Sequence, residues 1–326
     1  MRYFSFVLCA WVGLVASAPV FANIPGGGNG AGANVTLVNN GNGTVTLANG
    51  IVTAQIKTST AQVLQLTYNG FQVTDGGTAA NNGFYWQGSS GGSDTLTIIV
   101  DPSTNGGDVA MIQLYDNATN SGANADAYRY FGLFRGSPGI YVSEVMVHTA
   151  AMPAGGVDVP SLTCKLGGDI FNWLAQDTGR NQLMQRTSDS TIGGINNSPK
   201  EVTLLTEGQL AGRFDCKYDF SGDLGSLGFS GWCSTNQTSN FGLWCIHPSN
   251  EYFSNGPMHR EILAQMMLIN STFTGVHFGF HPDMNMAGGE NWSKVYGPFF
   301  MYFNKVAPGT PNPQTALYAD AVAQTS

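Results

Sequence analysis

Lys217 stands in the segment FDCKYDFSGD, between a cysteine and a tyrosine and among aromatic side chains. A lysine held near an apolar wall or another cation has a lowered pKa and can take up a proton as a base. The alternative is a solvated lysine on an outward strand position, or an ion-pair partner of Asp215 or Asp219. Lys217 is therefore a candidate general base, and both interpretations remain open.

Two histidines, His277 and His281, lie four residues apart in GVHFGFHPD. Glycines and aromatic residues favour a strand here, and residues four apart in a strand share one face. Imidazole holds a proton near neutral pH, so either histidine can serve as a general acid. A metal pair would need a third ligand, and none stands at a fixed spacing, so we expect no metal and no other cofactor. A hydrogen-bonded strand histidine is the alternative.

Arg135 lies in FGLFRGSPGIY, between an aromatic-rich strand and a Ser-Pro-Gly turn. A guanidinium at a strand end suits bidentate capture of a carboxylate. The alternative is an ordinary surface arginine. Asn250 and Glu251 stand in a further polar stretch, GLWCIHPSNEYFSNGPMHREILAQ, in a chain where only 10% of residues are charged. We found no GxSxG elbow and no phosphate-binding glycine loop.

The elements that must position these residues read as strands. TVTLANGIVTAQIKT and QVLQLTYNGFQV each alternate apolar and polar residues around an Asn-Gly pair, which is a strong hairpin signal. More than ten short strand candidates follow, separated by Gly, Asn and Ser turns, and helical periodicity is rare. The sequence predicts an all-β chain built as a large antiparallel β-sandwich.

The two ends differ in composition from this middle part. Residues 1–22 have a basic start, an apolar run and a small-x-small end, as in a secretory signal peptide. We expect cleavage after Ala22, a secreted protein and no membrane segment in the mature chain. Residues 23–304 form one domain, and the Pro-rich residues 305–326 read as a linker and the start of a missing C-terminal β domain.

Four cysteines remain after signal removal: Cys164, Cys216, Cys233 and Cys245. In an oxidising compartment an even set predicts two disulfides, with three pairings open. Asn-X-Ser/Thr triplets fit a glycoprotein. The formal charge of -8 and the lack of a basic run exclude nucleic-acid binding.

Several segments in the order found here resemble the rhamnogalacturonate lyases of polysaccharide lyase family 4. They are YFGLFRGSPGIYVSEVMVH, EVTLLTEGQLAGRFDCKYDFSGD, the polar stretch ending in MHREILAQ, GVHFGFHPD and NWSKVYGPFFMYFNKV. The resemblance runs from about residue 34 to residue 306. It implies a sandwich of the galactose mutarotase-like super-sandwich type. The family's two further β domains, one fibronectin-like and one carbohydrate-binding, are missing here.

The resemblance also implies a reaction. Such enzymes cleave rhamnogalacturonan I, the rhamnose–galacturonate backbone of plant cell-wall pectin, by β-elimination. The family's lysine base falls on Lys217 and its histidine acid on His277, with His281 as the second candidate. Arg135 matches the substrate-carboxylate arginine, and Tyr218, Asn250, Glu251 and His281 are expected substrate contacts. We expect a monomer without a cofactor. A non-catalytic carbohydrate-binding protein or truncated remnant of such a lyase is the alternative, and a sugar epimerase is a third.

Overall fold

The chain is described here from a computed structural model. The described residues are 30–74, 83–87, 95–119, 121, 123–157, 161–167, 169–175, 178–184, 192–193, 196–197, 200–206, 208–216, 229–247, 265–266, 269–275 and 284–325. Residues 1–22, for which the sequence predicts a signal peptide, and residues 75–82 and 88–94 lie outside them.

The first large sheet contains nine strands within the described residues, in the order β1-β2-β3-β4-β6-β12-β22-β21, with β5 paired to β4. Its strands are β1 (Thr36–Asn39), β2 (Thr44–Ala48), β3 (Val52–Lys57), β4 (Val63–Tyr68), β5 (Phe71–Gln72), β6 (Phe84–Gln87), β12 (Ser161–Lys165), β21 (Gln265–Met266) and β22 (Ile269–Gly275). The recorded pairings are antiparallel.

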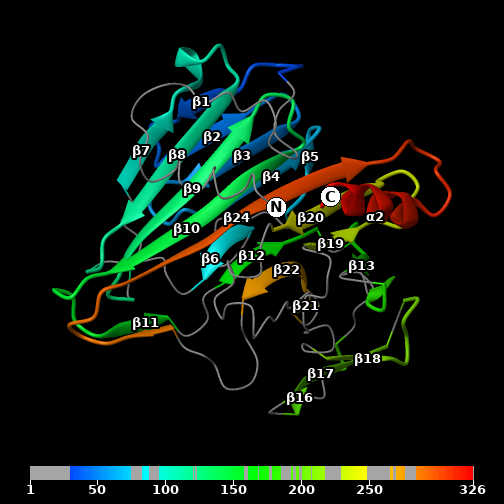
Figure 1. Ribbon diagram of the computed structural model, residues 1–326. Coiled ribbons are helices and arrows are strands. Elements are labelled where there is room, and N and C mark those ends of the chain that lie inside the picture. The colour runs from blue at the N-terminus through cyan, green and yellow to red at the C-terminus, as the bar shows by residue number, and fades with distance from the viewer. Residues whose placement is uncertain are drawn as a thin grey trace.

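The second large sheet, again counted over the described residues, has nine strands in the order β14-β13-β19-β20-β24-β10-β9-β8-β7. Its strands are β7 (Thr95–Val100), β8 (Val109–Asp116), β9 (Asp126–Phe134), β10 (Gly139–His148), β13 (Trp173–Ala175), β14 (Asn181–Leu183), β19 (Phe229–Cys233), β20 (Phe241–Ile246) and β24 (Trp292–Lys305). The 14-residue strand β24 joins the two halves of this sheet, since it pairs with β10 on one side and β20 on the other. Figure 1 shows it running the length of the sheet.

Two small sheets complete the described strands. One is a two-stranded ribbon, in which β11 (Gly155–Val157) pairs with β23 (Met284–Met286) beyond the ends of β10 and β24 (Figure 1). The other has four strands and sits apart from the sandwich at the lower right of that view. It contains β15 (Ile192–Gly193), β16 (Asn196–Asn197), β17 (Lys200–Leu205) and β18 (Phe214–Cys216). A short 3-10 helix, η1 (Pro102–Thr104), precedes β8.

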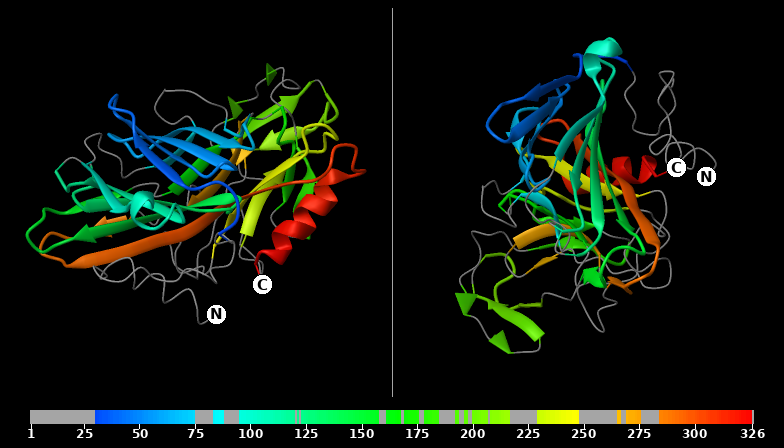
Figure 2. Two further views of the ribbon diagram at one scale, coloured as in Figure 1. Left: turned by 90° about the horizontal axis from the view of Figure 1, so that it is seen from above. Right: turned by 90° about the vertical axis from the view of Figure 1, so that its left-hand side faces the viewer.

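The main core lies between the two large sheets, which Figure 2 shows as layers. Leu47 and Ile56 of the first sheet belong to one buried cluster with Phe131 and Met301 of the second. Neighbouring residues of a strand point to opposite faces. Phe300, next to Met301, therefore joins a second cluster on the outer face of the second sheet. The prediction of an all-β chain built as a large antiparallel β-sandwich is confirmed.

Both predicted Asn-Gly hairpins are confirmed. β2 and β3 pair around Asn49 and Gly50, and Gly50 has a φ of 81°. β4 and β5 pair around Asn69 and Gly70, whose φ values are 49° and 78°. Asparagine and glycine tolerate positive φ at little cost, which is why this pair marks tight hairpins.

The outer face of the second sheet is covered by helix α2, Pro313–Ala323 (Figure 2). The helix contacts β19, β20 and β24, and its Leu317 and Ala321 are fully buried in the outer cluster. Within residues 305–326, for which the sequence predicts a linker and the start of a further domain, residues 313–323 form this helix and pack against the sandwich. β24 also continues to Lys305, one residue past the expected domain end.

A polar network fixes α2 at its centre. The Asp320 Oδ2 atom accepts hydrogen bonds from the Tyr302 hydroxyl and, at 2.7 Å, from Asn304 Nδ2. Asn304 Nδ2 also donates to the Leu317 carbonyl at 2.8 Å, and its Oδ1 accepts from Trp244 Nε1 at 2.9 Å. The helix is thus held by specific hydrogen bonds as well as by apolar burial.

The two predicted disulfides are wrong. Cys164, Cys233 and Cys245 are buried and form no disulfide among the described residues; Cys216 is the last residue of β18, and nothing is described of its side chain. Cys233 belongs to the outer cluster and Cys245 to the main core, so these two thiols point to opposite faces of one sheet. Burial raises the pKa of the Cys245 thiol to about 12 and raises that of Cys233 as well. Both thiols are therefore protonated and behave as small apolar side chains.

Candidate functional site

One of the predicted site residues, Arg135, lies within the described part of the chain. Lys217, Tyr218, Asn250, Glu251, His277 and His281 lie outside the described residues. The roles assigned to them stay predictions.

The described strands next to these residues belong to different sheets. Lys217 directly follows β18 of the small four-stranded sheet, and His277 comes two residues after β22 of the first large sheet. Arg135 directly follows β9 of the second large sheet. In the sequence, the candidate base, acid and cation thus follow strands of three separate sheets.

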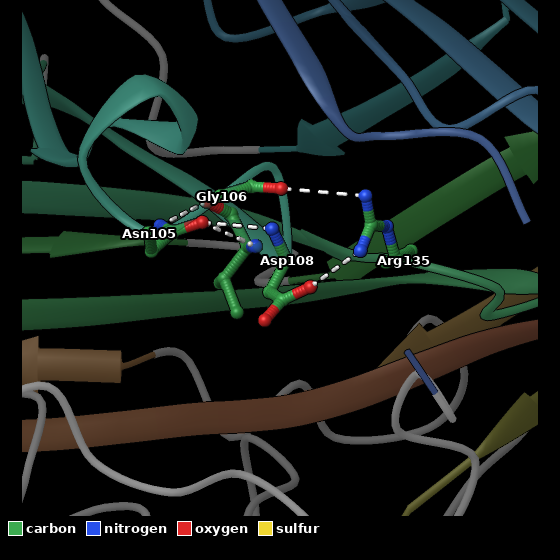
Figure 3. Close-up of polar contacts among 5 residues, drawn as sticks. Asn105, Gly106, Asp108 and Arg135 are labelled. Carbon is green, nitrogen blue, oxygen red and sulfur yellow. Dashed lines mark hydrogen bonds and ion pairs between the residues drawn. The ribbon is translucent and has the colours of Figure 1, made fainter. Parts of the chain in front are cut away.

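Arg135 opens the turn between β9 and β10 and contacts the loop that leads into β8 (Figure 3). Its Nη1 lies 3.1 Å from Asp108 Oδ1, and its Nη2 donates to the Gly106 carbonyl at 3.3 Å. The Arg135 backbone N–H donates to the Asp108 carbonyl at 2.8 Å. The Arg135 side chain is thus held by two residues of one short loop, Gly106 and Asp108.

The loop that receives Arg135 is itself ordered by Asn105. Asn105 Oδ1 accepts from the backbone N–H groups of Asp108 at 2.8 Å and Val109 at 3.1 Å. These two bonds are drawn beside the Arg135 contacts in Figure 3. Because Asp108 is held in place, the guanidinium meets a carboxylate whose position is set in advance.

The charge of Arg135 is already compensated in this arrangement. The Arg135 side chain is 22% exposed and that of Asp108 is 57% exposed, so the pair is reachable from solvent. A uronate carboxylate could reach the guanidinium only by sharing it with Asp108 or displacing it. No local pattern in the sequence points to this partner, which lies 27 positions earlier.

The turn that carries Arg135 is also bound to the first sheet by Asn49. This buried side chain donates from Nδ2 to the carbonyls of Phe134 and Ser137, each at 2.8 Å. Its Oδ1 accepts from the backbone N–H groups of Ile51 at 3.0 Å and Val52 at 2.8 Å. The Asn-Gly hairpin therefore positions the turn through four hydrogen bonds of one amide.

Sequence reasoning missed a buried polar row on the inner face of the second sheet. Arg129 on β9 and Tyr296 on β24 flank Glu144 on β10 in the strand register. Arg129 Nε donates to Glu144 Oε1 at 2.9 Å, with Arg129 0% and Glu144 3% exposed. Lys294 Nζ lies 5.6 Å from the centroid of the Tyr296 ring.

The electrostatics of this row follow from its burial. Burial raises the pKa of the Tyr296 hydroxyl, and the charge of Glu144 raises it further. Tyr296 is therefore a neutral hydrogen-bond donor throughout the physiological range. The signal for the row was present in the sequence, because Arg129 and Glu144 are charged residues at inward-facing positions of otherwise apolar strands.

Within the described part of the chain, no group of three or more His, Cys, Asp and Glu side chains is placed to hold a metal ion. A search of the same residues for a helix long and apolar enough to cross a membrane finds none.

No protein-family model matches the chain. A segment of 82 residues, 25% of the chain, is 29% identical to a probable rhamnogalacturonate lyase C of Emericella nidulans, of which it covers 8%. A segment of 77 residues, 24% of the chain, is 31% identical to a protein of the same name from Aspergillus oryzae, of which it covers 10%. The similarity therefore spans only about a tenth of the length of these relatives.

Solved structures resemble the chain at low identity. A TPR-domain containing protein from Parabacteroides distasonis gives a TM-score of 0.48 at 11% identity, over 81% of this chain and 48% of that one. A galactose mutarotase-like protein from Clostridium acetobutylicum gives 0.41 at 10%, over 81% and 95%. An Escherichia coli putative aldose 1-epimerase gives 0.40 at 8%, over 83% and 100%. At these scores the likeness carries no functional argument.

The two fungal matches indicate a distant relation to rhamnogalacturonate lyases over about a quarter of the chain. This relation points to a carbohydrate-related function.

Proposed function

We propose that the chain is a secreted polysaccharide lyase that cleaves the rhamnogalacturonan I backbone by β-elimination. The observation that carries this proposal is the sequence similarity to two fungal rhamnogalacturonate lyases. The ordered motifs around Lys217 and His277, and the large antiparallel sandwich, agree with it.

The reaction explains the residue types. A base removes the proton on C5 of the galacturonate, and negative charge builds up on the adjacent carboxylate. A cation facing that carboxylate stabilises the transition state more than the ground state. An acid then protonates the departing O4 oxygen, leaving an unsaturated uronate. We assign Lys217 as the base and His277 as the acid, with His281 as the second candidate for the acid.

We assign the uronate carboxylate to Arg135. In the substrate complex this requires the guanidinium to share or exchange its contact with Asp108, 3.1 Å away. Five N–H donors allow a guanidinium to hold two carboxylates at once. Tyr218, Asn250 and Glu251 are the proposed contacts to neighbouring sugars. A lysine base with an arginine clamp needs no metal, so EDTA is expected to leave the rate unchanged.

The decisive experiment follows ultraviolet absorbance during incubation with rhamnogalacturonan I, because elimination creates a conjugated unsaturated uronate. Absorbance should rise with the wild-type chain and stay flat with Lys217→Ala, while both proteins bind the polymer. Lys200→Ala, which removes a lysine outside the predicted site, is the matched control and should keep the activity.

Two other outcomes would contradict the proposal. Binding without any rise in absorbance supports the alternative function, a non-catalytic carbohydrate-binding protein. Full activity of Lys217→Ala would show that the base has been assigned to the wrong residue. Separate replacement of His277 and His281 by Gln shows which one donates the proton.

A further inference from the structure

His148, the last residue of β10, has an unusual pair of ring contacts. Its Nδ1 lies 2.8 Å from the carbonyl oxygen of Glu290, and its Nε2 lies 2.9 Å from that of Pro153. The residue is 1% exposed. Each ring nitrogen therefore faces a hydrogen-bond acceptor in a site that water does not reach freely.

A carbonyl oxygen can only accept, and a neutral imidazole has one N–H. With a neutral ring, one of the two contacts would place a nitrogen lone pair against a carbonyl oxygen. The imidazolium has two N–H groups and satisfies both. The Pro153 carbonyl, followed by the Glu290 carbonyl and the Glu290 charge, raises the pKa of His148 against the opposing effect of burial.

The ionisable groups around the ring come from three neighbouring elements. Glu290 lies in the connection before β24, and its Oε2 accepts from the Ala287 backbone N–H at 2.9 Å. On β9, Asp126 is paired in register with Val147 and accepts from the Ala118 backbone N–H at 2.8 Å. On β24, Lys294 is paired with Met146. The β11–β23 ribbon brings no charged residue, since its strands read GGV and MNM.

The two carbonyls belong to the two connections that flank this ribbon. Pro153 lies between β10 and β11, and Glu290 lies between β23 and β24. Two further bonds reinforce the arrangement: Ala150 N–H to Asn291 Oδ1 at 2.9 Å, and Asn124 Nδ2 to the Ala154 carbonyl at 2.8 Å. His148 is thus the point where both connections are held to the end of the second sheet.

The ribbon is adjacent in sequence to the candidate acid. β23 begins at Met284, three residues after His281 and seven after His277. β23 is therefore the described strand that follows both histidines in the sequence.

We propose, on the basis of the function proposed above, that His148 is a positioning residue. Its imidazolium clamps both connections of the β11–β23 ribbon and so fixes the end of the segment that carries the acid. Loss of one proton breaks one of the two bonds and loosens the ribbon.

The sign of the pH dependence follows from the raised pKa. The stabilisation is fully present below the unfolded-state pKa of histidine, about 6.5. It is lost as pH rises through the higher folded-state value. Alkaline conditions should therefore weaken the ribbon before the rest of the sandwich.

Hydrogen exchange of the ribbon amides, corrected for the intrinsic rate at each pH, tests the clamp without any substrate. His148→Gln, which can reach one carbonyl at most, should speed exchange by about tenfold at pH 6, the effect of losing one charged hydrogen bond. The difference in exchange rate between wild type and His148→Gln should disappear as pH rises. Asn124→Ala removes a contact that does not titrate, and it should speed exchange equally at every pH. Histidine nitrogen shifts in the NMR spectrum, assigned through His148→Gln, should show both ring nitrogens protonated at pH 6 and a titration midpoint above that of an unstructured histidine.

An elimination assay then links the clamp to the reaction. His148→Gln should flatten the alkaline side of the kcat profile while KM stays close to the wild-type value. If no elimination occurs but exchange and NMR behave as stated, the clamp stands and the proposed function fails. If His148 titrates at or below 6.5, or if the exchange gap is independent of pH, the clamp is overturned whatever the activity.

Discussion

Arg135 and Asp108 form an ion pair that is exposed enough to take part in binding and ordered enough to act as a brace. The two roles differ in what happens when Asp108 loses its charge. If Arg135 binds the substrate carboxylate, removing the Asp108 charge should strengthen substrate binding, because the two carboxylates compete for the guanidinium. If Arg135 only stabilises the turn, the same change removes one ion pair and leaves substrate binding unchanged.

Asp108→Asn should lower KM for rhamnogalacturonan by about two- to fivefold, the equilibrium factor of a surface ion pair, and should cost less than about 1 kcal/mol in stability. Steady-state kinetics and urea unfolding measure the two effects. Asp101→Asn removes the same charge from a side chain that accepts from the Ser103 backbone N–H, and it controls for the change in net charge. An unchanged KM in Asp108→Asn would assign Arg135 to the turn alone.

The Arg129–Glu144 pair differs because both side chains are buried. Arg129→Met should lower the free energy of unfolding by about 3–5 kcal/mol, since it removes the positive charge that is bonded to a buried carboxylate. The double variant Arg129→Met with Glu144→Leu should recover most of that loss. Urea unfolding of the two single variants and the double variant gives the coupling. A double variant as unstable as the sum of the singles would show that the two side chains do not depend on each other.

Among the elements, the β2–β3 hairpin has a second task besides pairing: it holds the β9–β10 turn through Asn49. The amide divides this work between its two ends. Nδ2 donates to the turn, and Oδ1 accepts from the hairpin itself.

Asn49→Asp separates these two tasks, because a carboxylate still accepts from Ile51 and Val52 but cannot donate to Phe134 and Ser137. It should destabilise the fold by about 2–3 kcal/mol, the cost of losing two hydrogen bonds to buried carbonyls. Asn49→Ala loses both the donated and the accepted hydrogen bonds, so it should lower the free energy of unfolding further. Urea unfolding ranks the variants, and exchange of the Arg135 amide reports on the turn. Equal stability of the Asp variant and the wild type would show that the turn does not rely on Asn49.

The sequence was informative where a local rule decides the structure. Asn-Gly pairs gave the hairpins, and alternation gave most strands, because both signals depend on neighbouring residues. Helix α2 was missed because its burial rests on Leu317 and Ala321, with alanines and a Pro-rich approach around them. The packing partners of α2 on β19, β20 and β24 are distant in sequence.

The candidate site shows the same division. Motif order located Lys217 and His277 as candidates, yet it gave no sign that Asp108 meets Arg135. The sequence shows that Arg129 and Glu144 are charged residues on otherwise apolar strands, but it does not show that they pair. The disulfide prediction failed for a related reason. Cysteine count does not reveal that Cys233 and Cys245 face opposite sides of a sheet.

The molecule as a whole carries a formal charge of -8, and the proposed substrate is a polyanion. Long-range repulsion should slow their encounter at low salt, and local cations should act only at short range. The association rate should therefore rise as ionic strength increases from about 10 to 150 mM, over which the Debye length falls from about 30 to 8 Å.

Stopped-flow binding or surface plasmon resonance measures this rate. Carboxyl-reduced rhamnogalacturonan, in which each uronate has become a neutral sugar, is the matched control and should show no salt dependence. If binding to the acidic polymer weakens steadily with salt, local cations such as Arg135 outweigh the net charge.

Strand β24 has a consequence for the order of biosynthesis. It lies at residues 292–305 yet occupies the middle of the second sheet, between β10 and β20. As the chain emerges from the ribosome, the two halves of that sheet have no strand to join them until residue 305 has been made. The edges of β10 and β20 must therefore wait for a late partner, and such non-local pairing folds slowly. A chain interrupted before β24 would expose two apolar sheet edges, so nascent chains of this protein should depend on chaperones until synthesis of this strand is finished.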